Sequence, residues 1–349
     1  MLLSKTMKRS LKYLAIRAGL EVSALPGVRS LQPSLGGRGV IFTLHHVRPP
    51  EKTSGFAPNA HLSITPEFLD VAIEAALECG LLPAHLHDLP QLTAQPHDGR
   101  KFFAFTLDDG YRNNAEYAAP VFRKFAVPYT IFITPGFVER TRSIWWETAE
   151  ALAKNNMSFR FDFGQGEETV AATTPAQKIA AFIRFEQFVS STDEDEAVAR
   201  IDRAARHHGI DPMAIVDRLV MNKGELAALS SDPLAHLGAH TMTHVNMRRV
   251  SNERLHQEIS QSTSRIEGYV GQRPRSFSYP YGWATAAADR EMKATLAAGF
   301  PVAVTTRPGV LTPQSLRQPT ALPRVSLNGH FQKKRYVKAL ISGLPFRLI

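Results

Sequence analysis

The sequence has 349 residues, of which 44% are hydrophobic, 21% are charged and one is cysteine. This composition allows one large domain with an insertion, or two domains, and it excludes bulk disorder and an internal disulfide framework. The formal net charge is +9, but the basic residues are scattered outside any nucleic-acid motif, which argues against a nucleic-acid binder and leaves loose association with an anionic membrane surface or polymer.

Residues 1–38 are predicted to form an N-terminal segment with an amphipathic helix. Lys12 and Arg17 interrupt its apolar positions, so the segment matches neither a signal peptide nor a membrane-spanning helix. We therefore expect a cytoplasmic protein, with possible peripheral contact at the inner face of the membrane. Four positions would share one helical face, which would pack on the domain or lie on a membrane surface. These positions are Leu11, Leu14, Ala15 and Ala18.

The first predicted strand covers residues 39–47 and ends in His45 and His46. Because side chains alternate along a strand, at most one of the two histidines points into a given site. The strand pattern alone favours packing roles for both. A helix over residues 63–79 and a strand over 81–86 are predicted to follow.

The sequence KFFAFTLDDGYR at 101–112 is the centre of the prediction. Its apolar run, 102–107, is typical of a strand buried on both faces in a parallel sheet. Asp108 and Asp109 follow at the carboxyl end of that strand, and Gly110 lets the chain turn. Two carboxylates at a buried strand end repel each other, so a metal or a shared proton is expected there, unless the residues only form a turn.

A helix over residues 115–125 and a strand over 127–134 continue a parallel, right-handed pattern. The following region, about 145–228, is predicted to be a helical insertion. It begins with Trp145 and Trp146, which would either stack on a sugar or anchor the insertion. Its acidic run, 193–196, is interpreted as a solvated helix face.

His240 and His244 follow a short strand predicted over residues 235–240. If the segment begins a helical turn, both imidazoles face the same way and can share one metal. With Asp109 they would form a three-ligand site that leaves positions open for water and substrate, as a catalytic metal requires.

Strands and helices alternate to the end of the chain, so we predict one distorted (β/α) barrel over 39–349. No internal repeat or low-complexity linker interrupts it. The remaining predicted elements are a helix at 255–269, strands at 275–282, 302–306 and 322–327, and a helix at 336–344.

Four motifs in this order resemble those of the NodB-homology polysaccharide deacetylases, carbohydrate esterase family 4. The resemblance covers residues 39–327. TLDDG at 106–110 is similar to the family's T-F-D-D-G, with Leu107 in place of the usual Phe, and HTMTH at 240–244 is similar to its H-[S/T]-x-x-H. FSYPYG at 277–282 and LPRVSL at 322–327 resemble its later motifs.

The resemblance implies a hydrolase that removes N-acetyl groups from an N-acetylhexosamine-containing polysaccharide, oligosaccharide or glycolipid, with a metal-bound water as nucleophile. It implies metal ligation by Asp109, His240 and His244, and a catalytic base at Asp108. The backbone N–H of Tyr281 is implied to stabilise the oxyanion. Candidate substrate-binding residues are Pro280, Trp145 and Trp146.

Two features depart from the family pattern. Ser278 stands where many members carry an arginine that orients the base, and the usual late histidine acid is not evident. One branch supplies the acid from the first strand, and His45 aligns with that histidine. The resemblance therefore implies His45 as general acid, with His46 and His330 as the alternatives.

Two imidazoles and a carboxylate suit zinc, while cobalt, nickel and iron accept similar ligands. The metal would polarise the amide carbonyl and activate water for Asp108 to deprotonate. Two other functions stay open: a different amidase or esterase on the same barrel, and a carbohydrate-binding protein without activity. The sequence leaves the sugar, its chain length and the oligomeric state open.

Overall fold

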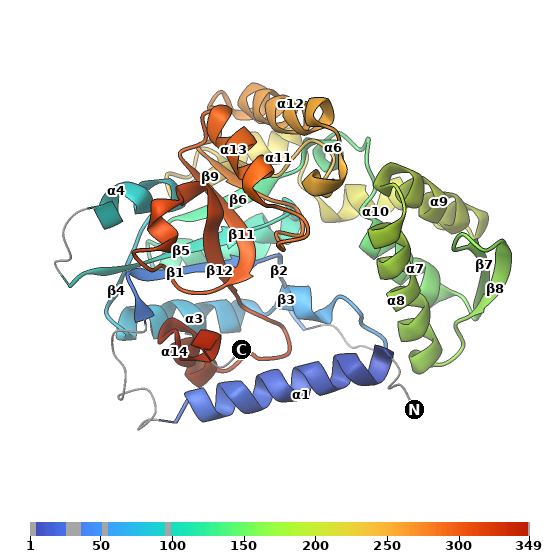
Figure 1. Cartoon of the computed structure of the whole chain (residues 1–349), viewed down its shortest axis with the longest axis horizontal. Helices are drawn as coiled ribbons and strands as arrows, with labels where there is room; N and C mark the ends of the chain where they lie inside the picture. The colour runs from blue at the N-terminus through green and yellow to red at the C-terminus, as the bar shows by residue number, and fades with distance from the viewer. Residues whose placement is uncertain (1–4, 26–35, 51–54, 95–98, 348–349) are drawn as a thin grey trace.

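Within the described residues, seven parallel strands close into a barrel surrounded by helices (Figure 1). The computed structural model describes residues 5–25, 36–50, 55–94 and 99–347. The strands follow the order β1, β12, β11, β10, β9, β6, β5, and β5 pairs with β1 to close the circle, so the predicted barrel is confirmed. The bounds are β1 Gly39–Leu44, β5 Lys101–Leu107, β6 Tyr129–Ile133, β9 Ala235–Ala239, β10 Ser276–Ser278, β11 Val302–Pro308 and β12 Leu322–Ser326.

The barrel strands form because their sequences are apolar on both faces. β1 and β6 are buried along their whole lengths, and β5 is buried from its second residue onward. Phe42 of β1 and Phe105 of β5 stack with ring centroids 4.9 Å apart. Because the strands are parallel, their carboxyl ends lie together at one end of the barrel, where folds of this class place their sites.

The barrel is irregular at two places. β4 (Leu81–Pro83) pairs with the first half of β5, whereas β6 pairs with the second half. β10 is only three residues long and is joined to β9 by a single residue pair, Phe277 with Ala239. The barrel wall is therefore thinnest between β9 and β10.

Most helices cover the outside of the barrel, and two further short strands, β2 (His46–Val47) and β3 (Ser63–Ile64), pair beside it. Among the described residues, no helix combines the length and the apolar character that crossing a membrane requires. The bounds of the covering helices are α3 Pro66–Glu78, α4 Leu89–Ala94, α5 Ala119–Lys124, α6 Pro135–Val138, α12 Asn252–Val270, α13 Asp289–Ala297 and α14 Lys334–Ile341.

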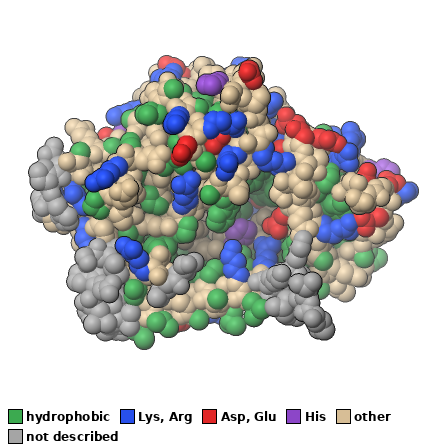
Figure 2. Space-filling view, viewed as in Figure 1, with side chains coloured by type: hydrophobic (Ala, Val, Ile, Leu, Met, Phe, Trp, Pro, Cys, Tyr) green, Lys and Arg blue, Asp and Glu red, His purple; other side chains and the backbone are tan. Residues whose placement is uncertain are grey.

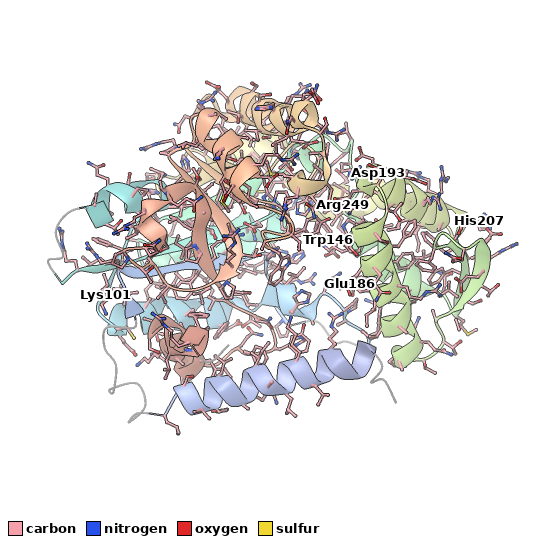
Figure 3. All side chains as sticks on the ribbon, in the orientation of Figure 1. Lys101, Trp146, Glu186, Asp193, His207 and Arg249 are labelled. Atoms are coloured by element: carbon pink, nitrogen blue, oxygen red, sulfur yellow. The ribbon has the colours of Figure 1, made fainter. Side chains whose placement is uncertain are left out.

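The predicted insertion lies between β6 and β9, and most of it forms the lobe at the right of Figure 1, whereas its last helix, α11 (Lys223–Leu229), lies beside α12. It is mainly helical, as expected, but it also contains an antiparallel hairpin of β7 (Ser158–Asp162) and β8 (Glu167–Ala171). Arg249 ties it to the barrel by donating to the carbonyls of Val189 and Thr192 (Figure 3). Its helices are α7 Trp145–Asn155, α8 Pro175–Ser191, α9 Glu194–His207, α10 Pro212–Leu219 and α11 Lys223–Leu229.

The predicted N-terminal helix is present as α1 (Lys5–Ser23), and of the two alternatives for its predicted apolar face, packing on the domain is not observed. Tyr13, Ile16 and Leu20 contact the region around α14. The four positions predicted to share a face, from Leu11 to Ala18, are all exposed, so they do not pack on the domain. Residues 1–4 and 26–35 of the predicted segment lie outside the described residues.

Three histidines cluster near the amino end of β9. The ring centroid of His87 lies 5.0 Å from that of His85 and 4.5 Å from that of His236. The pKa of His236 is lowered to about 3 and that of His87 to about 4, mainly by burial, with a contribution from the positive charge of Arg275 to both. The folded protein therefore resists protonation of these imidazoles, whereas the unfolded chain accepts protons near pH 6.5.

Because the folded-state pKa values lie below the unfolded ones, stability is expected to fall as the pH drops below about 6.5. Between pH 7.5 and 5.5, His236 alone is expected to contribute a loss of about 1 kcal/mol in the free energy of unfolding. His236→Gln keeps an acceptor for the Arg275 N–H and removes the titration. Urea unfolding at both pH values should show a smaller loss in the variant, and an unchanged pH dependence would contradict the assignment.

Candidate active site

Asp108 and Asp109 leave the end of β5 in different directions. Asp109 has a left-handed backbone, with φ of 75°, and Gly110 follows with φ of 70°. This conformation is costly for a residue with a side chain, and it is found where a site over-determines it. It directs the Asp109 carboxylate toward two histidines, while the Asp108 carboxylate contacts Arg324.

The structure brings together the three predicted metal ligands. Asp109 Oδ1 lies 3.6 Å from His240 Nε2 and 3.3 Å from His244 Nε2. All three side chains are buried, and the three ligand atoms lie within 4.8 Å of one another. Tetrahedral ligands held about 2.0–2.1 Å from a zinc ion would lie about 3.3–3.4 Å apart. The two measured distances are close to that separation.

The surroundings of these atoms also fit a cation. His240 Nδ1 donates to the carbonyl of Ser278 at 2.6 Å, which fixes the tautomer and leaves the Nε2 lone pair facing Asp109. Asp109 Oδ1 is buried without a hydrogen-bond partner among the described residues. Burial lowers the pKa of His240 to about 4, so this imidazole is neutral at pH 7. A buried anionic oxygen facing two imidazole nitrogens is a donor set suited to a divalent metal.

The loop that carries the two histidines is not the helical turn considered from the sequence. It is an irregular turn in which Thr241 and His244 both have φ of 59°. The Gly136 N–H donates to the carbonyl of Met242 at 2.8 Å, and a Cβ at Gly136 would lie only 2.7 Å from that oxygen. Buried Glu258 accepts from the N–H and the hydroxyl of Thr243. Backbone strain and these contacts, rather than helical spacing, make the imidazoles converge.

Arg324, which the sequence interpretation did not assign, contacts Asp108 directly. Its two terminal nitrogens each donate to one Asp108 oxygen at 2.7 Å. The same guanidinium also donates to the hydroxyl of Ser278 at 3.1 Å. Ser278 on β10 occupies the position at which the resemblance implied an arginine that orients the base. Here Arg324 of β12 contacts Asp108 instead. The LPRVSL motif contained Arg324, but its strand-like pattern gave no indication of its partner.

The ion pair controls the ionisation of Asp108. Burial alone would raise the pKa of Asp108, but the charge and hydrogen bonds of Arg324 hold it well below its usual range. Burial also opposes ionisation of Asp109, but the hydrogen-bond contact with His244 lowers the pKa of its carboxyl below the usual value. Both carboxylates are therefore anionic at neutral pH, and each has its own positively charged or metal-binding partner.

Hydrogen bonds fix Tyr281 through its backbone carbonyl and through its side-chain hydroxyl. Its backbone is left-handed, with φ of 61°, and its carbonyl accepts from the Thr306 hydroxyl at 2.6 Å. Its N–H makes no hydrogen bond within the described part of the chain. Its ring packs edge-on against the imidazole of His244, with the ring planes at 74° and the centroids 5.1 Å apart. An unpaired N–H on a fixed backbone next to a metal-ligand candidate has the form of an oxyanion donor.

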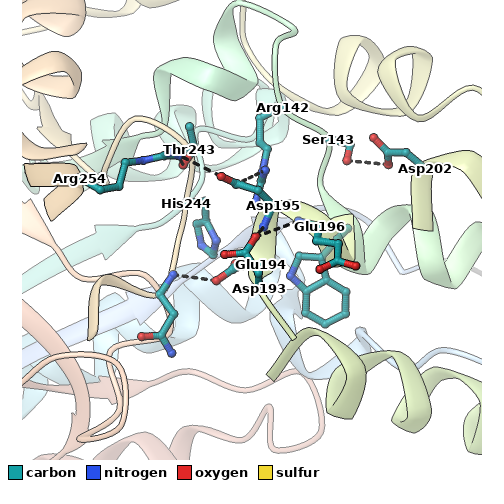
Figure 4. A network of polar contacts seen from close by, with 12 residues as sticks. Arg142, Ser143, Asp193, Glu194, Asp195, Glu196, Asp202, Thr243, His244 and Arg254 are labelled. Atoms are coloured by element: carbon teal, nitrogen blue, oxygen red, sulfur yellow. Dashed lines mark hydrogen bonds and ion pairs between the residues drawn. The ribbon is translucent and has the colours of Figure 1, made fainter. Parts of the chain in front are cut away.

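The insertion reaches the site through Glu194. This residue belongs to the acidic run interpreted as a solvated face, but it is buried, so that interpretation is wrong for Glu194. One oxygen accepts from the Tyr281 hydroxyl at 2.5 Å, and the other accepts from the Asn246 N–H at 2.8 Å. Figure 4 shows Glu194 beside His244, and Asp195 of the same helix between Arg142 and Arg254.

The paired tryptophans are only 8% exposed, which favours the anchoring interpretation over a sugar platform. Trp145 Nε1 donates to the Tyr281 hydroxyl and Trp146 Nε1 to the Tyr111 hydroxyl. Pro280 is also buried. By contrast, Trp283 is 55% exposed two residues after Tyr281. Trp283 gives no periodic signal in the sequence, because it is an isolated aromatic residue in a turn.

The three candidate acids occupy different environments. His45 follows β1, is partly exposed, and lies near enough for its charge to lower the pKa of Asp108 and Asp109. His46 is buried against the Tyr111 ring, and its Nδ1 lies 2.8 Å from the Asn113 amide nitrogen, which favours a packing role. The ring of His330 packs edge-on against Tyr13 of α1.

A comparison with protein families identifies the chain. A family model described as polysaccharide deacetylase matches residues 95–161 and 201–300. Over these ranges, 167 of the 349 residues, the chain matches the polysaccharide deacetylase family. The deacetylase is thus a hydrolase, and the matched ranges contain both aspartates, both histidine ligand candidates and Tyr281. The unmatched residues between the two ranges, 162–200, fall within the insertion.

Solved structures share the fold of the deacetylase at low sequence identity. A polysaccharide deacetylase from Bacillus cereus is 12% identical, with 86% of this chain and 68% of that chain covered and a TM-score of 0.52. IcaB from Ammonifex degensii is 14% identical, with 87% and 97% covered and a TM-score of 0.52. A de-N-acetylase from Aggregatibacter actinomycetemcomitans is 12% identical, with 84% and 96% covered and a TM-score of 0.52. A comparison with curated proteins gives no match.

Replacing Arg324 with Met is expected to lower the free energy of unfolding by about 3–5 kcal/mol, because Asp108 is left as an unpaired buried charge. The double variant Asp108→Asn/Arg324→Met should recover a large part of that loss, since no charge is then buried. Urea unfolding in the presence of a chelator measures both without a contribution from metal. Equal losses in the single and double variants would show that the ion pair is not the cause.

Replacing Glu194 with Gln is expected to disturb Tyr281 without removing a metal ligand. The amide NH₂ must face either the Tyr281 hydroxyl or the Asn246 N–H, which should cost about 1–3 kcal/mol of stability. Turnover is expected to fall about tenfold if the Tyr281 N–H shifts, since an oxyanion donor contributes about 3–4 kcal/mol when fully lost.

Glu196→Gln is the matched control on the same helix, because Glu196 is exposed and pairs only with Arg200 among the described residues. That control should change stability by less than about 1 kcal/mol and leave turnover unchanged. Equal effects of the two substitutions on turnover would contradict a specific role for Glu194.

Proposed function

We propose that the deacetylase removes N-acetyl groups from an N-acetylhexosamine-containing polysaccharide, oligosaccharide or glycolipid. The observation that carries this proposal is the buried group of Asp109, His240 and His244 beside an ionised Asp108. The description of one structural neighbour as a de-N-acetylase supports the choice of an amide-linked acetyl group.

Zinc is the metal that we propose for the site, because it is commonly held by two imidazoles and a carboxylate in catalytic sites. Asp109 Oδ1 and the Nε2 atoms of His240 and His244 would hold it. When bound, a divalent metal supplies Lewis-acid polarisation of the carbonyl and lowers the pKa of a coordinated water to near 7.

The residues of the chain would then divide the reaction between them. Asp108, oriented by Arg324, accepts the proton from the attacking water. The Tyr281 N–H donates to the carbonyl oxygen as it becomes an oxyanion, a contribution of about 3–4 kcal/mol. His45 gives its proton to the nitrogen as the carbon–nitrogen bond breaks. The products are acetate and a free amine, so atoms and protons balance.

We assign substrate contact to Trp283 in place of Pro280, which is buried. Trp283 presents an exposed ring next to the Tyr281 segment, and an aromatic face can pack on the apolar side of a sugar ring. Because Trp145 and Trp146 are buried and hydrogen-bonded, their proposed contribution is to shape the wall behind the substrate.

The experiment that tests this function measures acetate release from N-acetylglucosamine oligosaccharides together with bound metal. Asp109→Asn is expected to lose metal and at least about 10³-fold in turnover, because the anionic ligand and its water-activating metal are lost together. His45→Ala is expected to keep the metal and lose about 10²–10⁴-fold in turnover, the usual contribution of a general acid. Trp283→Ala should raise KM and leave the metal content unchanged.

The outcomes separate the remaining alternatives. Stoichiometric metal with no release of acetate, but with release of another acyl group or alcohol, would assign the site to a different amidase or esterase reaction. Saccharide binding without turnover of any acyl substrate would assign it to carbohydrate binding. Full activity of His45→Ala would overturn the assignment of the acid, and His46 and His330 would be tested next.

A further inference from the structure

Helix α1 carries apolar side chains on two opposite faces. Tyr13, Ile16 and Leu20 pack toward α14 and the segment before it. On the opposite face, Leu11 is 48%, Leu14 is 63% and Val22 is 52% exposed, with exposed Ala15 and Ala18 between them. These spacings of three and four residues place the exposed side chains in one continuous stripe. Packing within the described fold explains the first face but not the second.

Basic residues lie on both sides of the exposed stripe. At 100° per residue, Lys12 falls on one flank and Arg17 on the other. Both are exposed, and neither forms an ion pair within the described residues. The one acidic residue of α1, Glu21, is engaged by Lys333, Arg335 and Tyr336. The exposed side of the helix is therefore apolar at its centre and positive at its edges.

We propose that the exposed face of α1, defined by Leu11, Leu14, Ala15, Ala18 and Val22, docks the deacetylase on an anionic phospholipid bilayer. The leucine and valine side chains would enter the boundary between headgroups and acyl chains. The stems of Lys12 and Arg17 would follow them, while their charges stay at the level of the anionic headgroups. The net charge of +9 adds a favourable long-range attraction to the same surface.

A second copy of the chain fits this face less well than a bilayer. Two such stripes brought together would set the Lys12 and Arg17 charges of one copy beside those of the other, and like charges at an interface repel. An anionic headgroup layer neutralises both flanks instead. Figure 2 shows hydrophobic side chains along the lower edge of the molecule, where α1 runs in Figure 1. This edge is free of the barrel and the insertion, so a flat surface can approach it.

Co-sedimentation of the full chain with vesicles tests the proposal. The probes are vesicles of phosphatidylcholine alone and vesicles of phosphatidylcholine with 30% phosphatidylglycerol, the latter fraction chosen as about that of an anionic membrane surface. The parent protein is expected to bind the anionic vesicles and to release on raising the salt to about 0.5 M. Leu11→Asp/Leu14→Asp should weaken binding at least about tenfold, and Lys12→Gln/Arg17→Gln about fivefold for each charge removed.

Leu296→Asp is the matched control, because Leu296 is 58% exposed on α13, away from α1. It should bind vesicles like the parent. All variants are expected to keep the parent circular dichroism spectrum and acetate release from soluble substrate, which separates loss of docking from loss of folding. No binding of the parent to anionic vesicles, or equal losses in Leu296→Asp and Leu11→Asp/Leu14→Asp, would overturn the proposal. So would a stable dimer in sedimentation velocity that becomes monomeric in Leu11→Asp/Leu14→Asp.

Discussion

A fully buried guanidinium paired with a fully buried carboxylate is expensive to assemble, because both charges must leave water. In this barrel the Arg324–Asp108 pair overcomes that penalty with two parallel hydrogen bonds and with further bonds from Arg324 to Thr305, Thr106 and Ser278. Those partners lie on or directly after three other strands, β5, β10 and β11. The position of β12 relative to β5, β10 and β11 is therefore fixed by the same contacts that orient the candidate base.

The site also requires strained backbone conformations that contacts with the rest of the fold stabilise. Asp109, Thr241, His244 and Tyr281 all have positive φ values, a conformation that each would leave if unsupported. Their supports come from distant parts of the chain. Gly136 and Glu258 hold the histidine loop, and Glu194 and Thr306 hold Tyr281. The strained backbone directs one carboxylate, two imidazoles and one N–H toward a common region.

The sequence was sufficient for the barrel, because apolar strands ending in polar residues repeat along it, and for the Asp108, Asp109, His240 and His244 cluster, because motif spacing carries local geometry. It was insufficient where the partner is remote. Nothing near Arg324 indicates a carboxylate more than 200 residues away. Glu194 is indistinguishable from its acidic neighbours until α9 is docked, and the α1 helix offers two apolar faces of which only packing selects one. Side-chain patterns indicate which residues are buried, but they do not indicate which residues of the chain contact them.

The thin wall between β9 and β10 has an evolutionary consequence. One residue pair of the sheet joins these strands, yet they carry the histidine loop on one side and Tyr281 on the other. Glu194 connects the segments that follow the two strands, because it accepts hydrogen bonds from Asn246 after β9 and from Tyr281 after β10. The position of Tyr281 relative to the histidine loop is thus set partly by a helix of the insertion, far in sequence from the motifs that carry these residues. Sequence changes in that helix can shift Tyr281 while Asp109, His240 and His244 stay unchanged, and the helix is therefore a target for directed evolution.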